Sequence, residues 1–339
     1  PGSASGAART KLRRRGRRND KENSIEMNAG GKPLFQGKGR LFPDSFQRAN
    51  AGAPSGIVCL REAMRNMRLL VIGGDVRNLY LARLALSRGH DAALIGHGEN
   101  DIAPVGEYDA AALPYPAAEK EGGAPCAHGN LPMEAAMARA AGGARVYAAK
   151  AGPALEVILR QKGCVRIDPS RDEAFVQENA AITAECALWA MAARTRACLC
   201  GAECLVLGYG RIGRALALRL RALGARVTVL ARSASALAAA KGDGMDFSPL
   251  GGEIPAKRHR LAFNTIPAPA AGEALLSRLA PDAYAMELAS APYGIDLEAA
   301  RRLHVTAWRE SGLPGRAAPE SAAAAMLSLI ERTQRTDGA

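Results

Sequence analysis

The chain has 339 residues, of which 48% are hydrophobic and 4% aromatic, and its formal net charge is +12. This length suits two domains of ordinary size, and no run of 18 uncharged apolar residues offers a membrane span. The N-terminal charges are not followed by an apolar segment, so we expect no secretory signal. Seven cysteines without a regular framework indicate a reducing compartment, so we expect a cytoplasmic protein.

The positive charge is concentrated at the start of the chain. Residues 1–66 hold 14 Lys and Arg against 5 Asp and Glu, whereas the remaining 273 residues carry a net charge of only +3. The basic run Arg9–Arg18 lies among Gly, Ser, Asn and Pro, which cannot bury enough apolar surface to offset the entropy of ordering. We therefore predict a disordered basic extension over 1–66 without a role in the main activity. An arm that binds nucleic acid is the less favoured alternative.

An α/β domain is predicted over residues 67–180. The apolar run Leu69–Ile72 ends in "GGD", a helical pattern follows, and Asp91–Gly96 indicates a second strand, which together make one parallel unit. Tyr108–Pro116, "ARVYAAK" and "GCVRID" are further strand candidates. The "GGD" turn has too few glycines for a dinucleotide fingerprint, so a tight turn and a ligand-binding role both stay open.

A long helix is predicted between two domains. Residues 179–197 have high helix propensity and no internal Gly or Pro, which indicates a helix of several turns. We assign the interdomain helix to 181–200. Thr183 and Glu185 would lie near its start, where a carboxylate also suits the helix dipole. Glu185 could therefore be a first-turn acid with a structural role only, or it could have a functional role, and both alternatives remain open.

The stretch 204–231 has the pattern of a dinucleotide-binding unit. A strand at Cys204–Leu207 leads into Gly208, Gly210 and Gly213, then a helix to about Leu223 and a strand over 225–231. The first glycine permits the tight turn, the second lets the backbone approach a pyrophosphate, and the third lets the helix pack closely on the sheet. We predict a Rossmann domain over 201–315.

The cofactor is predicted to be NADP. NAD sites usually place a carboxylate at the end of the second strand, but this chain has Ala231 there, followed by Arg232 and Ser233. A guanidinium and a hydroxyl can receive a 2′-phosphate. Arg211 either contacts the pyrophosphate or is a solvated residue of the first helical turn.

The remaining strands, over 261–267, 283–290 and 303–308, end in polar segments. Ligands bind beyond the carboxyl ends of parallel strands, so Asn264, Thr265, Ser290 and the loop Gly312–Gly315 are expected to line the nicotinamide and the substrate. A closing helix begins at Pro319, within a C-terminal segment 316–339. The fold class is therefore α/β, with two Rossmann-like parallel-sheet domains and a cleft between them. No metal is expected, because Cys198, Cys200 and Cys204 lack a fourth ligand at zinc-like spacing.

The motifs "VIGGDVRN", "LPYP", "NAAITAE", "LGYGRIGRAL", "FNTIP", "ELAS" and "GLPGRAAPESAA" occur in the same order as in the A subunit of dipicolinate synthase, which the chain resembles over roughly residues 67–333. The resemblance implies NADP-dependent oxidation of a dihydrodipicolinate-type intermediate, from the lysine pathway, to dipicolinate in the mother cell of a sporulating bacterium. It also implies a partner, the flavoprotein-like B subunit. Cys186, Glu287 and Glu320 depart from the family pattern.

The motifs and the resemblance together assign site residues. Cofactor binding falls on the glycine loop, the end of the second strand and the "NTIP" segment: Gly208, Tyr209, Gly210, Arg211, Ile212, Gly213, Arg232, Ser233, Asn264, Thr265, Ile266 and Pro267. Substrate binding falls on both domains: Arg77, Asn78, Asn179, Thr183, Ser290, Gly312, Leu313, Pro314 and Gly315. Glu185 is the candidate for proton transfer, and Ser290 is a second catalytic candidate.

Two other functions stay open at this point. The chain could be a different NADP-dependent dehydrogenase of a small carboxylate, or a non-catalytic dinucleotide-binding protein that regulates a partner. A homo- or hetero-oligomer is expected in each case.

Overall fold

The computed structural model describes residues 66–335, apart from 128 and 257. These residues fall within one compact unit, Arg65–Ala339. The extension predicted over 1–66 lies almost wholly outside the described residues.

The first sheet has five parallel strands in the order β2-β1-β3-β6-β7. Their bounds are β1 Arg68–Ile72, β2 Asp91–Ile95, β3 Tyr108–Ala112, β6 Ala140–Tyr147 and β7 Val165–Ile167. Numbered within the sheet, this order is 2-1-3-4-5, the flavodoxin-like arrangement. A separate antiparallel hairpin, β4 (Gly123–Cys126) and β5 (Gly129–Pro132), follows β3.

The second sheet has six parallel strands in the order β10-β9-β8-β11-β12-β13. Their bounds are β8 Glu203–Leu207, β9 Arg226–Ala231, β10 Asp246–Pro249, β11 Leu261–Asn264, β12 Tyr284–Glu287 and β13 Thr306–Arg309. This is the 3-2-1-4-5-6 order of dinucleotide-binding sheets. The predicted fold class is confirmed. The strand order of the first sheet differs from that of the second, and the edge strand β10 was not predicted.

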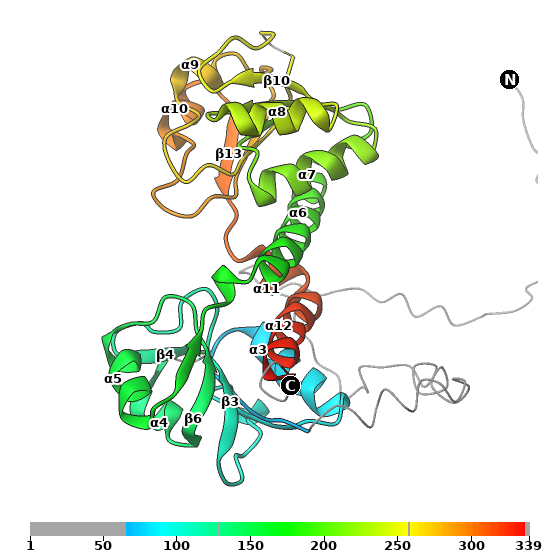
Figure 1. Ribbon diagram of the computed structural model, residues 1–339. Helices are drawn as coiled ribbons and strands as arrows, with labels where there is room; N and C mark the ends of the chain where they lie inside the picture. Colours follow the sequence, from blue (N-terminus) through cyan, green and yellow to red (C-terminus); the bar gives the residue numbers. More distant parts are fainter. Residues whose placement is uncertain (1–65, 128, 257, 336–339) are drawn as a thin grey trace, which may run out of the picture. The chain divides into compact units, whose positions relative to one another are not determined.

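Helices connect the parallel strands (Figure 1). Their bounds are α3 Val76–Ser87, α4 Met133–Met137, α5 Pro153–Lys162, α6 Glu173–Thr195, α7 Arg211–Ala222, α8 Ala234–Gly242, α9 Glu273–Leu276, α10 Leu297–Arg302, α11 Leu313–Ala317 and α12 Pro319–Arg335, with 3₁₀ turns at Gly98–Asn100 and Pro169–Arg171. Within the part of the chain that the structure describes, no helix is both long enough and apolar enough to cross a bilayer.

Helix α6 begins earlier than the sequence indicated. Asp172 caps it, because its carboxylate accepts a hydrogen bond from the Phe175 N–H at 2.8 Å. Glu185 therefore lies in the middle of the helix, and its interpretation as a first-turn acid is wrong. Phe175 packs in the core of the first sheet, whereas Met191 packs in that of the second, so the one helix serves both sheets.

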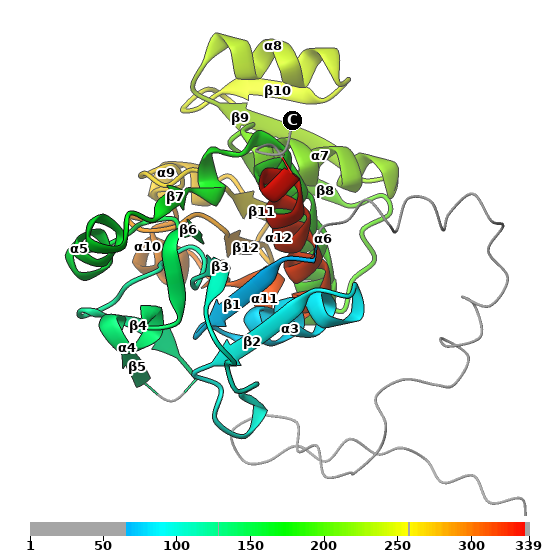
Figure 2. The ribbon, with the colours of Figure 1, turned by 60° about the horizontal axis from the view of Figure 1, so that its bottom comes forward.

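Helix α12 packs beside α3 and α6, as both ribbon views show (Figures 1 and 2). Leu327, Leu329 and Ile330 are fully buried in one cluster with Leu69 and Val71 of β1. The closing helix therefore completes the core of the first sheet, which is built from two segments far apart in the sequence.

Candidate functional site

The turn between β8 and α7 is a tight glycine loop with one open position. Gly208 has φ +95°, and a Cβ there would lie 2.5 Å from Thr265 Oγ1. A Cβ on Gly213 would lie 2.2 Å from the Gly208 carbonyl oxygen. At Gly210, which precedes the first residue of α7, a Cβ would meet nothing within 4 Å, and no side chain caps the helix. The loop thus leaves space and unpaired N–H groups at a helix N-terminus, an arrangement that suits an anion.

A cavity of about 520 Å³ opens beside this loop. Its lining residues come from the carboxyl ends of β8, β9 and β11 and from α8: Gly208, Tyr209, Gly210, Ala231, Arg232, Ser233, Ser235, Ala236, Ala239, Thr265, Ile266 and Pro267. The strand order reverses at β8, so the cavity lies at the switch point where open α/β sheets bind ligands. Its volume is within the range of cofactor pockets. Most of the residues predicted to bind the cofactor line this cavity together.

The end of this cavity at β9 suits a phosphate group. Arg232 is exposed, and no carboxylate among the described residues pairs with it. Ser233 caps α8 by accepting a hydrogen bond from the Ala236 N–H at 3.2 Å, and its Oγ lies 3.2 Å from that of Ser235. Ser235 was not predicted from the sequence. Its position in the first turn of a helix that directly follows a strand indicates that its side chain lies beside that of the N-cap residue, Ser233.

Tyr209 is fixed by a network behind the loop. Its hydroxyl donates to Asp243 at 2.8 Å, and Arg214 donates to both oxygens of the same carboxylate at 2.7 and 3.0 Å. The Arg214 and Tyr209 hydrogen bonds lower the pKa of Asp243 to about 2. Burial and the neighbouring Asp243 charge raise the pKa of Tyr209. The network ties the glycine loop to the C-terminal end of α8.

Asn264 does not line this cavity. It is fully buried, and its amide donates to Glu287 Oε1 at 2.7 Å and to the Ile266 carbonyl at 3.0 Å. Glu287 also accepts hydrogen bonds from the backbone N–H groups of Gly294 and Ile295 at 2.7 and 2.8 Å. Asn264 therefore positions the segment 265–267 instead of contacting a ligand, because every polar atom of its amide is engaged internally.

A second cavity of about 280 Å³ adjoins the first through Gly210 and Thr265. Its walls come from the loop after β3, α6, the glycine loop with the start of α7, and the residue after β11: Tyr115, Val176, Asn179, Ala180, Gly210, Arg211, Ile212, Gly213 and Thr265. The Asn179 carboxamide is half-buried there, and no hydrogen bond joins it to another described side chain. This cavity is the expected cleft between the two sheets. Tyr115, which the sequence analysis did not select, belongs to the "LPYP" motif.

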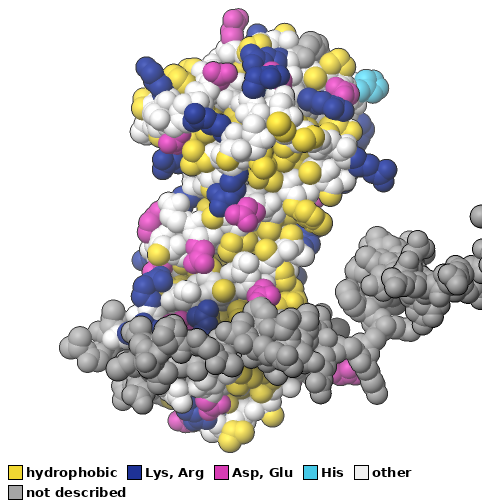
Figure 3. Space-filling model, turned by 90° about the vertical axis from the view of Figure 1, so that its right-hand side faces the viewer, with side chains coloured by type: hydrophobic (Ala, Val, Ile, Leu, Met, Phe, Trp, Pro, Cys, Tyr) yellow, Lys and Arg dark blue, Asp and Glu magenta, His cyan; other side chains and the backbone are white. Residues whose placement is uncertain are grey.

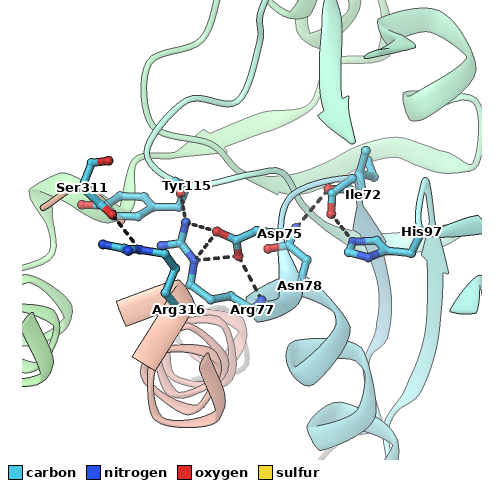
Figure 4. A network of polar contacts seen from close by, with 9 residues as sticks. Ile72, Asp75, Arg77, Asn78, His97, Tyr115, Ser311 and Arg316 are labelled. Carbon is cyan, nitrogen blue, oxygen red and sulfur yellow. Dashed lines mark hydrogen bonds and ion pairs between the residues drawn. The ribbon is translucent and has the colours of Figure 1, made fainter. Parts of the chain in front are cut away.

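Arg77 and Asn78 are engaged by their own part of the fold (Figure 4). The Arg77 guanidinium donates to Asp75 at 2.8 Å through both Nε and Nη2, and to the Tyr115 carbonyl at 2.8 Å. Asn78 donates to the Ile72 carbonyl at 3.0 Å. Both residues line, with Tyr115, a narrow space of about 20 Å³, room for about one water molecule. The two predicted substrate residues thus lie near Asn179 but not in the larger cavity.

Three other predicted positions lie apart from both large cavities. Thr183 is buried and donates to the Asn179 carbonyl at 2.7 Å. Glu185 is exposed and pairs with Arg219 at 3.0 Å. Ser290 is exposed in the loop held by Glu287. The structure does not bring these side chains to the cavities.

The segment Gly312–Gly315 is not the loop that the sequence indicated. Gly312 precedes α11, and the next three residues form its buried first turn. A Cβ on Gly315 would lie 2.7 Å from Asp75 Oδ2, so this segment packs against the Asp75–Arg77 pair. Its backbone is used for helix packing because α11 contacts α3, α6 and α12.

Charged side chains of both signs are interspersed over the face shown in Figure 3, and the described residues visible on that face form no single large basic area. Within the described residues, no group of three or more His, Cys, Asp or Glu side chains could hold a metal ion.

Comparisons with known proteins agree with this geometry. No protein-family model matches the chain. It is 27% identical over 287 residues to the A subunit of dipicolinate synthase from Bacillus subtilis, covering 79% of this chain and 96% of the relative. The crystal structure of the same A subunit from Bacillus subtilis superposes with a TM-score of 0.68 and 26% identity, covering 80% of this chain and 97% of that one. This chain resembles the A subunit of dipicolinate synthase.

Two further structures share the fold. The A subunit of dipicolinate synthase from Bacillus halodurans has a TM-score of 0.68 at 23% identity and covers 80% of this chain and 99% of that one. A transhydrogenase from Sinorhizobium meliloti has a TM-score of 0.53 at 15% identity and covers 79% of this chain and 92% of that one. The resemblance to the dipicolinate synthase protein is confirmed by the match to the Bacillus subtilis A subunit in sequence and in structure. With the strand order and the glycine loop, it supports a dinucleotide-binding, oxidoreductase-like role.

Proposed function

We propose that this chain is the A subunit of a dipicolinate synthase, an NADP-dependent oxidoreductase that converts a dihydrodipicolinate-type intermediate of the lysine pathway to dipicolinate. The observation that carries the proposal is the cavity at the ends of β8, β9 and β11. There Ala231 stands where NAD sites have a carboxylate, and Arg232 and Ser233 follow it, in a chain similar to a dipicolinate synthase protein.

The residues present fit NADP. Gly210 leaves open the space that a Cβ would fill, so the backbone N–H groups of the loop and the N-terminus of α7 can bind a pyrophosphate. Arg232, Ser233 and Ser235 would bind the 2′-phosphate. When bound, NADP supplies the hydride acceptor for the oxidation.

We assign the substrate to the second cavity. Asn179 offers an amide donor for a carboxylate of a cyclic dicarboxylate. Oxidation of a dihydropyridine ring gains aromaticity, so the chain mainly has to orient the ring and neutralise its charges. None of the described residues that line the cavity is a carboxylate, and Glu185 lies elsewhere, so we assign the departing proton to water.

A partner protein is part of the proposal. The name of the relative describes it as one subunit of a synthase, which indicates an assembly of that protein. By this resemblance we propose that the chain works with a flavoprotein-like B subunit, in the mother-cell cytoplasm of a sporulating bacterium.

The test is NADPH formation by the chain, with and without a B subunit, on the product of dihydrodipicolinate synthase acting on pyruvate and aspartate semialdehyde. Arg232→Ala should weaken NADPH binding about 10- to 100-fold, as expected for a charge-assisted phosphate contact, and leave NADH binding unchanged. Arg301→Ala, which removes an exposed arginine from α10, is the control.

Three results would contradict parts of the proposal. A preference for NAD would remove the cofactor assignment. Turnover only of another small carboxylate would favour a different dehydrogenase. Binding of NADPH without turnover of any substrate, even with the B subunit, would favour a regulatory role.

A further inference from the structure

Arg211 of the glycine loop is held by a carboxylate at the start of α6. Its Nη2 and Nε donate to the two oxygens of Glu173 at 2.7 and 3.1 Å. Arg211 is the first residue of α7, whereas Glu173 is the first residue of α6. The contact therefore joins the N-termini of the two helices that flank the second cavity, through a bidentate pair of the geometry that guanidinium groups favour.

Glu173 is fixed from its own side of the pair. Gln177, one turn along α6, donates to Glu173 Oε1 at 2.7 Å. The preceding residue, Asp172, caps α6 and accepts a hydrogen bond from Arg332 of α12 at 2.7 Å. The start of α6 is thus tied to the helix that completes the first sheet, independently of Arg211.

The Glu173 carboxylate is ionised throughout the neutral range. The hydrogen bonds from Arg211 and Gln177 lower its pKa to about 2. Both members of the pair are about half exposed, so an incoming anion can reach them.

Arg211 can serve only one bidentate anion at a time. A pyrophosphate bound at the glycine loop presents anionic oxygens that a guanidinium can bind in the same bidentate way as a carboxylate. The pyrophosphate would lie beside Arg211, whose guanidinium is already paired with Glu173. We propose that Glu173 competes with the pyrophosphate of the dinucleotide for Arg211, and so acts as a positioning residue that weakens cofactor binding. This proposal rests on the dinucleotide site proposed above but not on the identity of the substrate.

The competition also helps the cofactor to leave. When the pyrophosphate departs, Arg211 returns to a carboxylate already in place, so its charge is compensated in both states. Removing the carboxylate should therefore lower the dissociation rate of NADPH more than it changes the association rate, since affinity differences within one site arise mostly in dissociation.

The experiment is a fluorescence titration of the full chain with NADPH. Glu173→Gln should lower the Kd about fivefold, the scale of an exposed ion pair, and the gain should shrink at high salt. Glu178→Gln is the matched control: it removes the same charge from an exposed position of α6 with no ionic partner among the described residues. The control should change the Kd less than about twofold.

Two further arms isolate the mechanism. In an Arg211→Gln background, Glu173→Gln should have no effect, which is the signature of a direct coupling. Binding of 2′-AMP, which lacks the pyrophosphate, should be the same in the unsubstituted chain and in Glu173→Gln.

The proposal is overturned if Glu173→Gln binds NADPH as Glu178→Gln does, or more weakly than the unsubstituted chain. Failure of the underlying site is distinguishable, because the unsubstituted chain would then bind neither NADPH nor NADH, which overturns both assignments.

Discussion

The two sheets begin with the same construction, a buried strand, a glycine turn and a helix, yet their turns are completed differently. After β1, the carboxylate of Asp75 caps α3 by accepting a hydrogen bond from the Arg77 N–H at 3.0 Å. After β8, Gly210 provides no side-chain cap to α7. The N-terminus of α3 is capped by the carboxylate of Asp75, whereas the N-terminus of α7 has no side-chain cap and can receive an external anion.

The surroundings reinforce this difference. In the first turn the Gly74 N–H donates to the Pro125 carbonyl of the β4–β5 hairpin at 2.6 Å, and a Cβ on Gly73 would lie 2.3 Å from the same oxygen. In the second turn the space beside Gly210 is open. A glycine turn after a buried strand is therefore not sufficient for a dinucleotide site. The turn can receive an external anion only where no carboxylate of the chain caps the helix and no hairpin covers the turn.

The largest expected effects separate the two roles of glycine in the second turn. Gly213→Ala places a Cβ against the Gly208 carbonyl and should lower the free energy of unfolding by about 1–3 kcal/mol. Gly210→Ala meets no protein atom, so it should leave stability unchanged while weakening NADPH binding about tenfold, because the methyl group enters the space of the pyrophosphate. Urea unfolding and NADPH titration measure the two effects. Equal loss of stability in both variants would show that the space beside Gly210 is not open.

Removing the carboxylate of Asp75 from the first turn should lower the free energy of unfolding less than Gly213→Ala does. Asp75→Ala should lower the free energy of unfolding by about 1 kcal/mol through loss of the helix cap, without creating a second dinucleotide site, because the hairpin still covers the turn. Asp75→Asn keeps a good capping residue and should lose less. Urea unfolding and the stoichiometry of NADPH binding check this. A second NADPH bound by Asp75→Ala would contradict the claim that the β4–β5 hairpin closes the first turn.

The same acid predicts a pH dependence. Partial burial raises the pKa of Asp75, but the hydrogen bonds and charge of Arg77 outweigh this, so the net pKa is lowered. A lowered pKa in the folded state gives stability that is present above the ordinary value of about 4 and is lost as the pH falls through the folded-state pKa. The difference in stability between the unsubstituted chain and Asp75→Asn should be constant from neutral pH to about 4 and shrink below it. A difference that already shrinks near neutral pH would point to another group.

The smallest effect is expected behind the second turn. Tyr209→Phe removes one hydrogen bond to Asp243 but leaves the two from Arg214, so stability should fall by about 0.5 kcal/mol and NADPH affinity by about twofold. The pKa of Asp243, now about 2, should rise toward its ordinary value, which titration by NMR can follow. An unchanged pKa would show that Tyr209 does not restrain this carboxylate.

The glycine loop and the Arg232–Ser233 pair could be assigned to one site from the sequence because their pattern is local, and both line the same cavity. Gly208, Gly210 and Gly213 lie within six residues, and the pair Arg232–Ser233 directly follows a strand. Strand order in the second sheet follows from the same pattern, since the known connections of such units are few.

Residues whose role depends on distant partners could not be placed in this way. Asn264 ends a strand, as a ligand-binding residue can, but its amide donates a hydrogen bond to Glu287 on the next strand instead of facing the cavity. The pair Glu173–Arg211 joins helices from different sheets, so neither residue signals the other. The start of α6 was missed because Asp172 caps it outside the stretch of strongest helix formers.

Helix α12 has a consequence for synthesis of the chain. The core of the first sheet needs Leu327, Leu329 and Ile330, which the ribosome adds after every strand of the second sheet, whereas the second sheet is encoded by one continuous stretch. Domains generally fold as units while the chain emerges, so the second sheet is complete first and the first sheet waits with one apolar face uncovered. A nascent chain stalled before Pro319 should therefore hold a protease-resistant second sheet beside a first sheet that is still digestible, and should need chaperone protection until α12 is released.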